Sequence, residues 1–262
     1  MANAEHGRNG GAGSAGAGGA GAGGMRVALI TGGGSGVGRA VARRLSEEGY
    51  ALALVGRRVE ALKETGAALK TPWAAIAADV ADPKDAAGIV DRAVERFGRL
   101  DVLINNAGYG PPAAIADTTA EMVRAVFDVN AVGPAITIAR ASPVMEKSAR
   151  AGGRCVVVNV SSMATIDPFP TLYAYAAAKA AVNLMARSCH NAGRAIEGGG
   201  SIRAFAVAPG AVETEMLRGI VSRDEFPTEK TLAPEAVAEV IAACVRGDRD
   251  DQSGEVIVVP SP

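Results

Sequence analysis

Residues 31–38 read TGGGSGVG, and this glycine-rich stretch lies between a short apolar run and a helix-like pattern. The run at 26–30 (RVALI) has the length and composition of a strand that is covered on both faces. Beyond it, Val37, Val41 and Leu45 recur every fourth residue, which predicts a helix with one apolar face. Glycines permit a tight turn, and the first N–H groups of a helix can bind phosphate. The stretch therefore predicts a strand–turn–helix unit that can bind a nucleotide, although its spacing is not the usual GxGxxG.

The same alternation of short apolar runs and helix-length segments continues to the end of the chain. Apolar runs at 51–55, 73–77, 100–104, 154–160, 202–208 and 255–259 each predict a further strand. Asp82, Pro83 and Asp85 predict the start of a helix, Gly98 predicts its end, and Pro234 opens another. We predict one α/β domain over 25–262, a doubly wound, Rossmann-like parallel sheet of about seven strands with helices on both faces.

The charge balance argues against two classes of partner. The 262 residues carry 27 Lys and Arg against 28 Asp and Glu, so the chain has no positive excess for nucleic acid or an anionic membrane surface. No apolar run after residue 25 is expected to reach the roughly 18 residues of a membrane span. We therefore expect no nucleic-acid partner, no membrane and a cytoplasmic location.

Two further features concern the N-terminus and the metal-binding residue types. Gly and Ala make up 17 of the first 24 residues, which have little to bury, so we expect a disordered leader at 1–24. Cys155, Cys189 and Cys244 are odd in number and far apart, unlike a disulfide framework or a CxxC metal site. Because His6 and His190 are also isolated from other ligand types, we expect no metal site.

Ligands of such sheets bind beyond the carboxyl ends of the strands, so the residues at those ends are informative. After the second predicted strand, Gly56 is followed by Arg57 and Arg58, where NAD-preferring sheets carry an acid. A guanidinium can pair with a 2′-phosphate, so we predict NADP(H) as the preferred cofactor, contacted by Arg57, with NAD(H) possible. The alternative is that both arginines are solvated at the start of a helix.

Polar residues follow the other strands too, and a second pair lies on a predicted helix. The strand ends carry Asp79-Val80, Asn105-Asn106-Ala107-Gly108, Ser161-Ser162 and Pro209-Gly210-Ala211-Val212-Glu213-Thr214. On the helix predicted from about residue 172, Tyr175 and Lys179 are one turn apart and share a face. A nearby ammonium favours the phenolate and lowers a tyrosine pKa from about 10. Each of these motifs is a weak signal when taken alone.

Together, these residues resemble the short-chain dehydrogenase/reductase family. The resemblance covers nearly everything after Met25, with the motifs in the family order. They are TGGGSGVG at 31–38, DV at 79–80, NNAG at 105–108, Asn130, Ser162, YAAAK at 175–179 and PGAVET at 209–214. The resemblance implies an NAD(P)-dependent enzyme that moves a hydride between nicotinamide and a small-molecule carbonyl or alcohol.

The resemblance also implies a position for each matching residue along the cofactor. The pyrophosphate and adenosine end would be lined by Gly32, Ser35, Gly36, Val37 and Gly38. Asp79 and Val80 would flank the adenine, and Asn106, Ala107 and Gly108 would pass beside the cofactor. Val212 and Thr214 would hold the nicotinamide carboxamide, in the rigid turn that begins at Pro209.

Four residues would carry the chemistry. Tyr175 would be the acid/base, Lys179 would bind the nicotinamide ribose and lower the Tyr175 pKa, Ser162 would bind the substrate oxygen, and Asn130 would anchor a water. Tyr173 competes with Tyr175 for the acid role but has no Lys four residues later. Ser161 competes with Ser162, and the 13-residue spacing to Tyr175 favours Ser162.

The surroundings of this set suggest the substrate class. The residues expected to face the substrate are mainly apolar: Tyr109, Pro111, Pro112, Met163, Phe169, Pro170, Leu172, Met216 and Leu217. We predict a small, mainly apolar ketone or secondary alcohol, under a lid formed by residues 213–232. Alternatives are a 3-oxoacyl thioester reductase, a polyol dehydrogenase, or a non-catalytic dinucleotide sensor, which would be expected to lack the catalytic set. The resemblance further implies a homo-dimer or homo-tetramer, paired through the helices that carry Asn130 and Tyr175.

Overall fold

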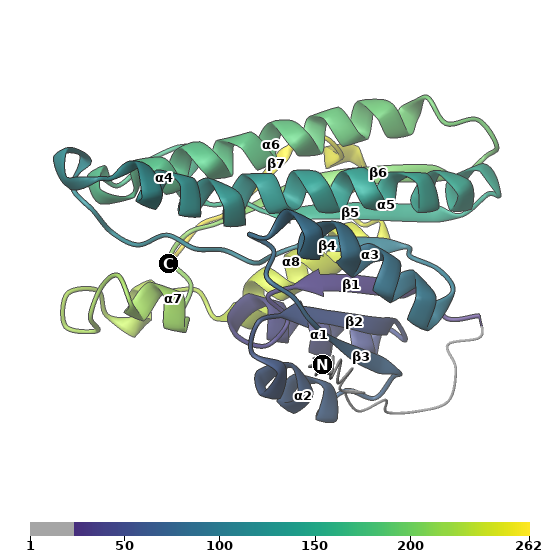
Figure 1. The fold of residues 1–262 in the computed structure, drawn as a ribbon, viewed down its shortest axis with the longest axis horizontal. Helices are drawn as coiled ribbons and strands as arrows, with labels where there is room; N and C mark the ends of the chain where they lie inside the picture. Colours follow the sequence, from purple (N-terminus) through teal and green to yellow (C-terminus); the bar gives the residue numbers. More distant parts are fainter. Residues whose placement is uncertain (1–23) are drawn as a thin grey trace, which may run out of the picture.

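Seven parallel strands form a single sheet in the order β3-β2-β1-β4-β5-β6-β7 (Figure 1). The computed structural model describes residues 24–262. The strands are β1 (Val27–Thr31), β2 (Ala51–Gly56), β3 (Trp73–Ala77), β4 (Val102–Asn105), β5 (Arg154–Val160), β6 (Ser201–Pro209) and β7 (Val256–Val259). The predicted α/β class and doubly wound parallel sheet are confirmed, while the leader predicted at 1–24 lies, except for Gly24, outside the described residues.

Helices cover both faces of the sheet, because the strands are apolar on both sides. The helices are α1 (Gly36–Glu47), α2 (Val59–Ala67), α3 (Pro83–Phe97), α4 (Ala120–Phe127), α5 (Gly133–Arg150), α6 (Tyr173–Arg194), α7 (Glu215–Arg218) and α8 (Pro234–Arg246). Along β1, Ala28 and Ile30 pack in one core with α1 and α8, and Leu29 packs in the other with α3 and α5. Figure 1 shows α4, α5 and α6 together along one side of the molecule.

Helix α3 begins and ends for the predicted reasons. The Asp82 carboxylate accepts hydrogen bonds from the N–H groups of Lys84 (2.8 Å) and Asp85 (3.1 Å), which no carbonyl within the helix can pair. Gly98 ends the helix with a φ of 79°, a conformation that side chains disfavour. The predicted start of α8 at Pro234 is confirmed as well.

A buried polar network fixes the carboxyl ends of β4 and β5 against α5 and α6. The Asn105 amide donates to Asn159 Oδ1 (3.0 Å), and Thr137 Oγ1 of α5 donates to Asn105 Oδ1 (2.8 Å). Asn159 in turn donates to the Val182 carbonyl of α6 (3.1 Å). Unpaired polar groups would be costly at these buried positions, so the network restricts how the two helices can pack. It therefore sets the position of α6, which carries Tyr175 and Lys179.

One expectation about apolar segments is wrong. Residues 120–150 form a continuous helical stretch that is long and apolar enough, by length and composition alone, to cross a membrane, and an 18-residue window within it has a mean hydropathy of 1.3. The expectation failed because it considered uninterrupted apolar runs, whereas this window is apolar on average and holds no more than two charged residues. About a third of that window (33%) is buried inside the protein. Further apolar side chains of this stretch, Val123, Phe127 and Ile138, are partly buried against the core.

Candidate active site

Two loops at the carboxyl edge of the sheet are joined by the hydroxyl group of Thr31. Thr31 Oγ1 accepts hydrogen bonds from the backbone N–H groups of Asn106 and Ala107, both at 3.0 Å. The Asn106 side chain donates back to the Thr31 carbonyl (2.9 Å). The glycine-rich turn after β1 and the NNAG loop after β4 thus hold each other in place. This contact brings Gly32, Asn106, Ala107 and their neighbours together as the sequence predicts.

The glycine-rich turn has the geometry of a phosphate cradle. Gly32 and Gly36 adopt φ angles of 68° and 50°, in the left-handed region that favours glycine. A Cβ on Gly38 would lie 2.2 Å from the Gly32 carbonyl oxygen, so no side chain fits at that position. Ser35 stands at the N-cap of α1 without a side-chain bond to the helix, so the first N–H groups lack a side-chain cap. These features fit the pyrophosphate of a dinucleotide.

The two arginines after β2 lie in different surroundings. Arg57 forms an ion pair with Asp79 after β3, with 3.7 Å between Nη1 and Oδ2. Arg58 Nη2 instead lies 3.4 Å from Ser35 Oγ and 3.2 Å from the Glu215 carboxylate. The sequence pattern favoured Arg57 as the contact to a 2′-phosphate, whereas Arg58 is the arginine that reaches the glycine-rich turn. Val80, beside Asp79, packs its carbonyl against Gly133 at the start of α5.

Asn130 lies in a π-helical turn, Asp128–Val132, that joins α4 to α5. Its side-chain amide donates to the carbonyls of Tyr109 (2.6 Å) and Val126 (2.7 Å), and Oδ1 accepts from the Tyr109 N–H (3.2 Å). A Cβ built on Gly108 would lie 3.4 Å from Asn130 Oδ1 and 3.7 Å from Lys179 Nζ. Asn130, the NNAG loop and Lys179 are therefore neighbours, as predicted. Single π turns are frequent at functional sites.

Tyr175 and Lys179 lie on successive turns of α6 and face the same side. Lys179 Nζ is 5.6 Å from the centroid of the Tyr175 ring and donates to the Val160 carbonyl at 2.8 Å. The ring is also confined by the NNAG loop, since a Cβ on Gly110 would lie 2.8 Å from Tyr175 Cδ2. Tyr173, the competitor, is 36% exposed and lines the pocket beside Tyr175. The two tyrosines therefore differ in that Tyr175 is the one whose ring lies beside the lysine.

The direction predicted for the Tyr175 pKa is wrong for the protein alone. Desolvation raises the pKa of Tyr175 to about 12, and hydrogen bonding with Ser162 opposes that rise. Burial also lowers the pKa of Lys179 to about 8. The nearby lysine charge was expected to lower the pKa of Tyr175, but the loss of water around the phenol raises it. Tyr175 accordingly keeps its proton at neutral pH, which suits a proton donor.

Ser161 and Ser162 differ in what their hydroxyl groups do. The buried Ser161 hydroxyl donates to the Lys179 carbonyl at 3.4 Å, a contact between β5 and α6. Ser162 Oγ accepts from the Ala164 N–H (3.1 Å) and lies close enough to Tyr175 to affect its pKa. Ser162 is thus the serine that faces the phenol, in agreement with the predicted spacing.

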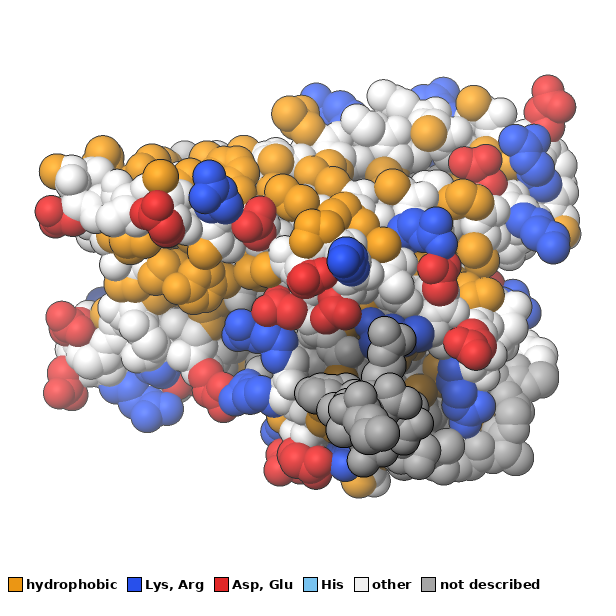
Figure 2. Space-filling model, in the orientation of Figure 1, with side chains coloured by type: hydrophobic (Ala, Val, Ile, Leu, Met, Phe, Trp, Pro, Cys, Tyr) orange, Lys and Arg blue, Asp and Glu red, His pale blue; other side chains and the backbone are white. Residues whose placement is uncertain are grey.

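An apolar pocket lies beside the Tyr175 side chain. Its lining residues come from the loop after β4, from α4 and from the start of α6, and they are Pro111, Ala113, Thr118, Met122, Val126, Thr171, Leu172, Tyr173, Ala174 and Tyr175. Of the predicted substrate-facing residues, Pro111 and Leu172 line it, and Met216 of α7 reaches the Gly110 side of the Tyr175 ring. Figure 2 shows hydrophobic side chains in the hollow between the α4 end of the molecule and the segment around α7.

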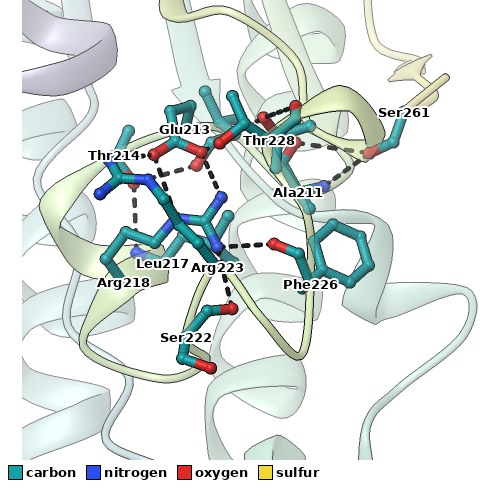
Figure 3. Close-up of polar contacts among 12 residues, drawn as sticks. Ala211, Glu213, Thr214, Leu217, Arg218, Ser222, Arg223, Phe226, Thr228 and Ser261 are labelled. Carbon is teal, nitrogen blue, oxygen red and sulfur yellow. Dashed lines mark hydrogen bonds and ion pairs between the residues drawn. The ribbon is translucent and has the colours of Figure 1, made fainter.

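The loop after β6 is held by hydrogen bonds to residues of β7 and just beyond it, and by a β-bridge to a later part of the same segment. Beyond Pro209, the N–H of Gly210 donates to the Val259 carbonyl (2.9 Å), and the N–H of Ala211 donates to Ser261 Oγ (2.8 Å; Figure 3). Val212 forms an isolated β-bridge with Leu232. Thr214 caps α7, and its Cγ2 lies 3.0 Å from the position of a Cβ on Gly36. The loop therefore reaches back to the glycine-rich turn, as the predicted cofactor contacts require.

Glu213 organises the segment that follows this loop (Figure 3). Its carboxylate pairs with both Arg218, through Nε at 3.0 Å and through Nη2, and Arg223, at 2.9 Å. Arg218 also donates to the carbonyls of Ser222 and Phe226. These contacts fold residues 214–226 onto one carboxylate. The Arg218 hydrogen bonds, with help from Arg223, lower the pKa of Glu213 to about 2.

Several residues of the site were not identified from the sequence. Thr31 and Asn159 each look like polar interruptions of an apolar strand, and the position of such residues at a strand end is the signal that could have found them. Gly110 follows the NNAG motif, yet its contact with Tyr175 depends on where α6 lies. Glu215 has no local signal, because Arg58, its partner, is 157 residues away.

Comparisons with known proteins agree with this geometry. A family model described as short chain dehydrogenase matches residues 26–225. A Streptomyces violaceoruber protein assigned as ketoacyl reductase 2 of granaticin polyketide synthase is 37% identical over 245 residues, covering 89% of this chain and 94% of its own. The crystal structure of 3-ketoacyl-(acyl-carrier-protein) reductase from Brucella melitensis complexed with NADH has a TM-score of 0.81 and 29% identity, covering 90% and 96%. Levodione reductase has a TM-score of 0.80 and 28% identity, covering 90% and 96%.

The Glu213 cluster gives a prediction about stability and pH. Glu213→Gln should lower the melting temperature at pH 7 by about 2 °C, because Arg218 and Arg223 lose their common partner. A carboxylate whose folded-state pKa is lowered stabilises the fold above its unfolded value. The difference in melting temperature between the unmodified protein and Glu213→Gln should therefore persist down to about pH 4.5 and shrink as the pH falls toward about 2. Thermal unfolding followed by circular dichroism measures it.

Glu229→Gln is the matched control, since it removes the same charge from an exposed position in the same segment. Equal melting temperatures of Glu213→Gln and Glu229→Gln at pH 7 would show that the cluster does not stabilise this segment.

Proposed function

Because this chain belongs to the short-chain dehydrogenase family and is an NAD(P)-dependent oxidoreductase of CH–OH and C=O groups, we propose that it reduces apolar ketones with NADPH. The observation that carries the proposal is the grouping of Tyr175, Lys179, Ser162 and Asn130 at the carboxyl edge of the sheet. Mainly apolar residues line a small pocket beside Tyr175.

The residues of the turn and loops fit a dinucleotide. Gly32, Gly36 and Gly38 leave room for it at the N-terminus of α1, and Asn106, Ala107 and Gly108 would lie along it. Asp79 and Val80 would border the adenine, while Val212 and Thr214 would hold the nicotinamide end. When bound, the nicotinamide supplies the hydride for reduction or accepts it in oxidation.

The proton is the part of the reaction that belongs to the chain's own residues. Tyr175, with its raised pKa, holds a proton that it can give to a carbonyl oxygen as negative charge develops there. Ser162 would donate a hydrogen bond to the same oxygen. Lys179 keeps positive charge near the phenol and would bind the ribose, and Asn130 Oδ1 retains a lone pair with which to hold a water.

A 3-oxoacyl thioester is the second substrate class to consider. It is favoured by the likeness to the Streptomyces protein assigned as a ketoacyl reductase. The exposed ring of Phe169 and the partly exposed side chains of Tyr109 and Met216 offer apolar surface for an acyl chain. We propose that residues 213–232 act as the lid of this site, since the segment carries Met216 and closes on Glu213. We also infer a cytoplasmic location, which agrees with three unpaired cysteines.

The catalytic proposal predicts the effect of removing one hydroxyl group. Tyr175→Phe should lower kcat by about 10²- to 10⁴-fold and leave the NADPH dissociation constant unchanged, because the variant lacks only the proton donor. NADPH absorbance measures turnover on a panel of cyclic ketones, a 3-oxoacyl thioester and polyol-derived ketoses.

Tyr173→Phe is the matched control and should retain turnover, since it keeps the aromatic ring that lines the pocket and leaves the Tyr175–Lys179 pair intact. Unchanged turnover of Tyr175→Phe would refute its assignment, and turnover confined to polyols or charged sugars would refute the apolar substrate class.

The cofactor proposal predicts which arginine matters most. The unmodified protein should bind NADPH more tightly than NADH, and Arg58→Ala should narrow that difference about tenfold, the size expected for one charge-assisted contact to phosphate. Arg57→Ala should narrow it less, because Arg57 is turned toward Asp79. Quenching of protein fluorescence measures both dissociation constants. Equal affinities in the unmodified protein would contradict the preference.

We also propose a homo-dimer or homo-tetramer that pairs through α5 and α6. The outer faces of these helices expose small and apolar residues, among them Ala135, Ala139, Ala177, Ala180 and Leu184, which is 63% exposed. Small residues let helices approach closely. Figure 2 shows hydrophobic side chains across the side of the molecule where α4 and α5 lie.

Leu184→Arg should convert the assembly to smaller species in sedimentation velocity, because it puts a charge into the buried contact. Ala67→Arg, at an exposed position of α2, is the control and should leave the assembly unchanged. A monomer in the unmodified protein would remove the proposal.

A further inference from the structure

An ion pair connects the proposed cofactor site to the proposed lid. Glu215 is the first residue of α7, and its carboxylate lies 3.2 Å from Arg58 Nη2. The same nitrogen lies 3.4 Å from Ser35 Oγ in the glycine-rich turn. One guanidinium therefore joins the turn after β1, the loop after β2 and the segment after β6.

The position of Glu215 relative to the turn is fixed by its neighbours. Thr214, the preceding residue, packs against Gly36 and caps α7. A cavity of about 260 Å³ separates this part of the segment from α1, and Ser35, Gly36, Thr214 and Glu215 are among its lining residues. Ser35 and Glu215, the two residues of this cavity lining that contact Arg58, thus stand where the adenosine end of a dinucleotide would lie.

A carboxylate and a phosphate bind a guanidinium through the same hydrogen-bond geometry. Arg58 cannot present the same N–H groups to both, and a carboxylate left beside a phosphate repels it. A 2′-hydroxyl, which is neutral, does not need to displace Glu215. The charge of Glu215 thus weakens the binding of NADPH and leaves the binding of NADH largely unaffected.

We propose that Glu215 is a specificity-determining residue that competes with the 2′-phosphate for Arg58 and so couples the choice of cofactor to the lid. The inference rests on the NADPH preference proposed above. With NADPH, Arg58 exchanges the carboxylate for the phosphate, and the start of α7 is released. With NADH, the Arg58–Glu215 pair stays in place.

The strength of the pair is consistent with exchange. The side chains of Arg58 and Glu215 are 65% and 76% exposed, so water and salt weaken their attraction. Such a pair cannot exclude a doubly charged phosphate, but it can lower the discrimination between the two cofactors. The Arg57–Asp79 pair is longer, at 3.7 Å, and of these two arginines it is Arg58 whose guanidinium lies within 3.4 Å of Ser35 Oγ.

The test compares dissociation constants of NADPH and NADH in a double-mutant cycle. Glu215→Gln keeps the size of the side chain and removes its charge. We expect it to increase the ratio of the NADH to the NADPH constant about three- to tenfold, mainly through tighter NADPH binding. In the Arg58→Ala background the same substitution should change the ratio less than about twofold, because the contested group is gone.

Glu229→Gln controls for the loss of a negative charge on the same segment and should leave the ratio unchanged. Amide hydrogen exchange of residues 215–218 gives an independent readout. In the unmodified protein, NADPH should speed exchange of these residues and NADH should not. In Glu215→Gln, NADPH should speed their exchange less than it does in the unmodified protein. A merely structural role for Glu215 would change the melting temperature without changing the ratio, and that outcome would overturn the inference.

The design separates failure of this inference from failure of the proposed preference. If Arg58→Ala narrows the preference but Glu215→Gln leaves the ratio unchanged, NADPH selection stands and the competition is refuted. If the unmodified protein binds both cofactors equally, the proposed preference fails. In that case a rise in the ratio on Glu215→Gln would still support the competition, and no rise would refute it.

Discussion

The hydrogen bonds of Thr31 are the contact on which the site depends. Its hydroxyl oxygen accepts from two consecutive N–H groups of the NNAG loop, and its carbonyl accepts from Asn106. A parallel sheet brings strand ends to one edge but does not fix how the loops beyond them lie. Because β1 and β4 are adjacent, this residue can tie the glycine-rich turn to the loop that packs on Tyr175. The glycine-rich turn and the NNAG loop, at the two ends of the proposed cofactor site, are thus both held by Thr31.

Much of the fold could be predicted because its signals are local. The β5 run at 154–160 is apolar nearly throughout and bounded by polar segments, and the strand occupies those residues. Asp82 and Gly98 mark the ends of α3 through bonds and φ angles that involve their own neighbours. Tyr175 and Lys179 were placed on one helix face by their spacing alone. Family motifs in order then related these local features to a common site.

The remaining features depend on groups that are distant in sequence. Asn159 lies within an apolar strand, and nothing near it in the sequence indicates a role. Only the packing of α5 and α6 shows why its amide is needed. Arg57 and Arg58 look alike in the sequence, and their different partners, Asp79 after β3 and Glu215 on α7, distinguish them. The direction of the Tyr175 pKa was mistaken for a related reason, since desolvation is a property of the assembled site.

The bond from Ala211 to Ser261 has a practical consequence for handling the protein. Ser261 follows β7, and its hydroxyl oxygen accepts a hydrogen bond from the backbone that leads to Val212 and Thr214. A purification tag or fluorescent fusion joined directly after Pro262 would pull on this anchor and disturb the loop. Enzymologists comparing differently tagged preparations should see this in their Michaelis constants for the dinucleotide.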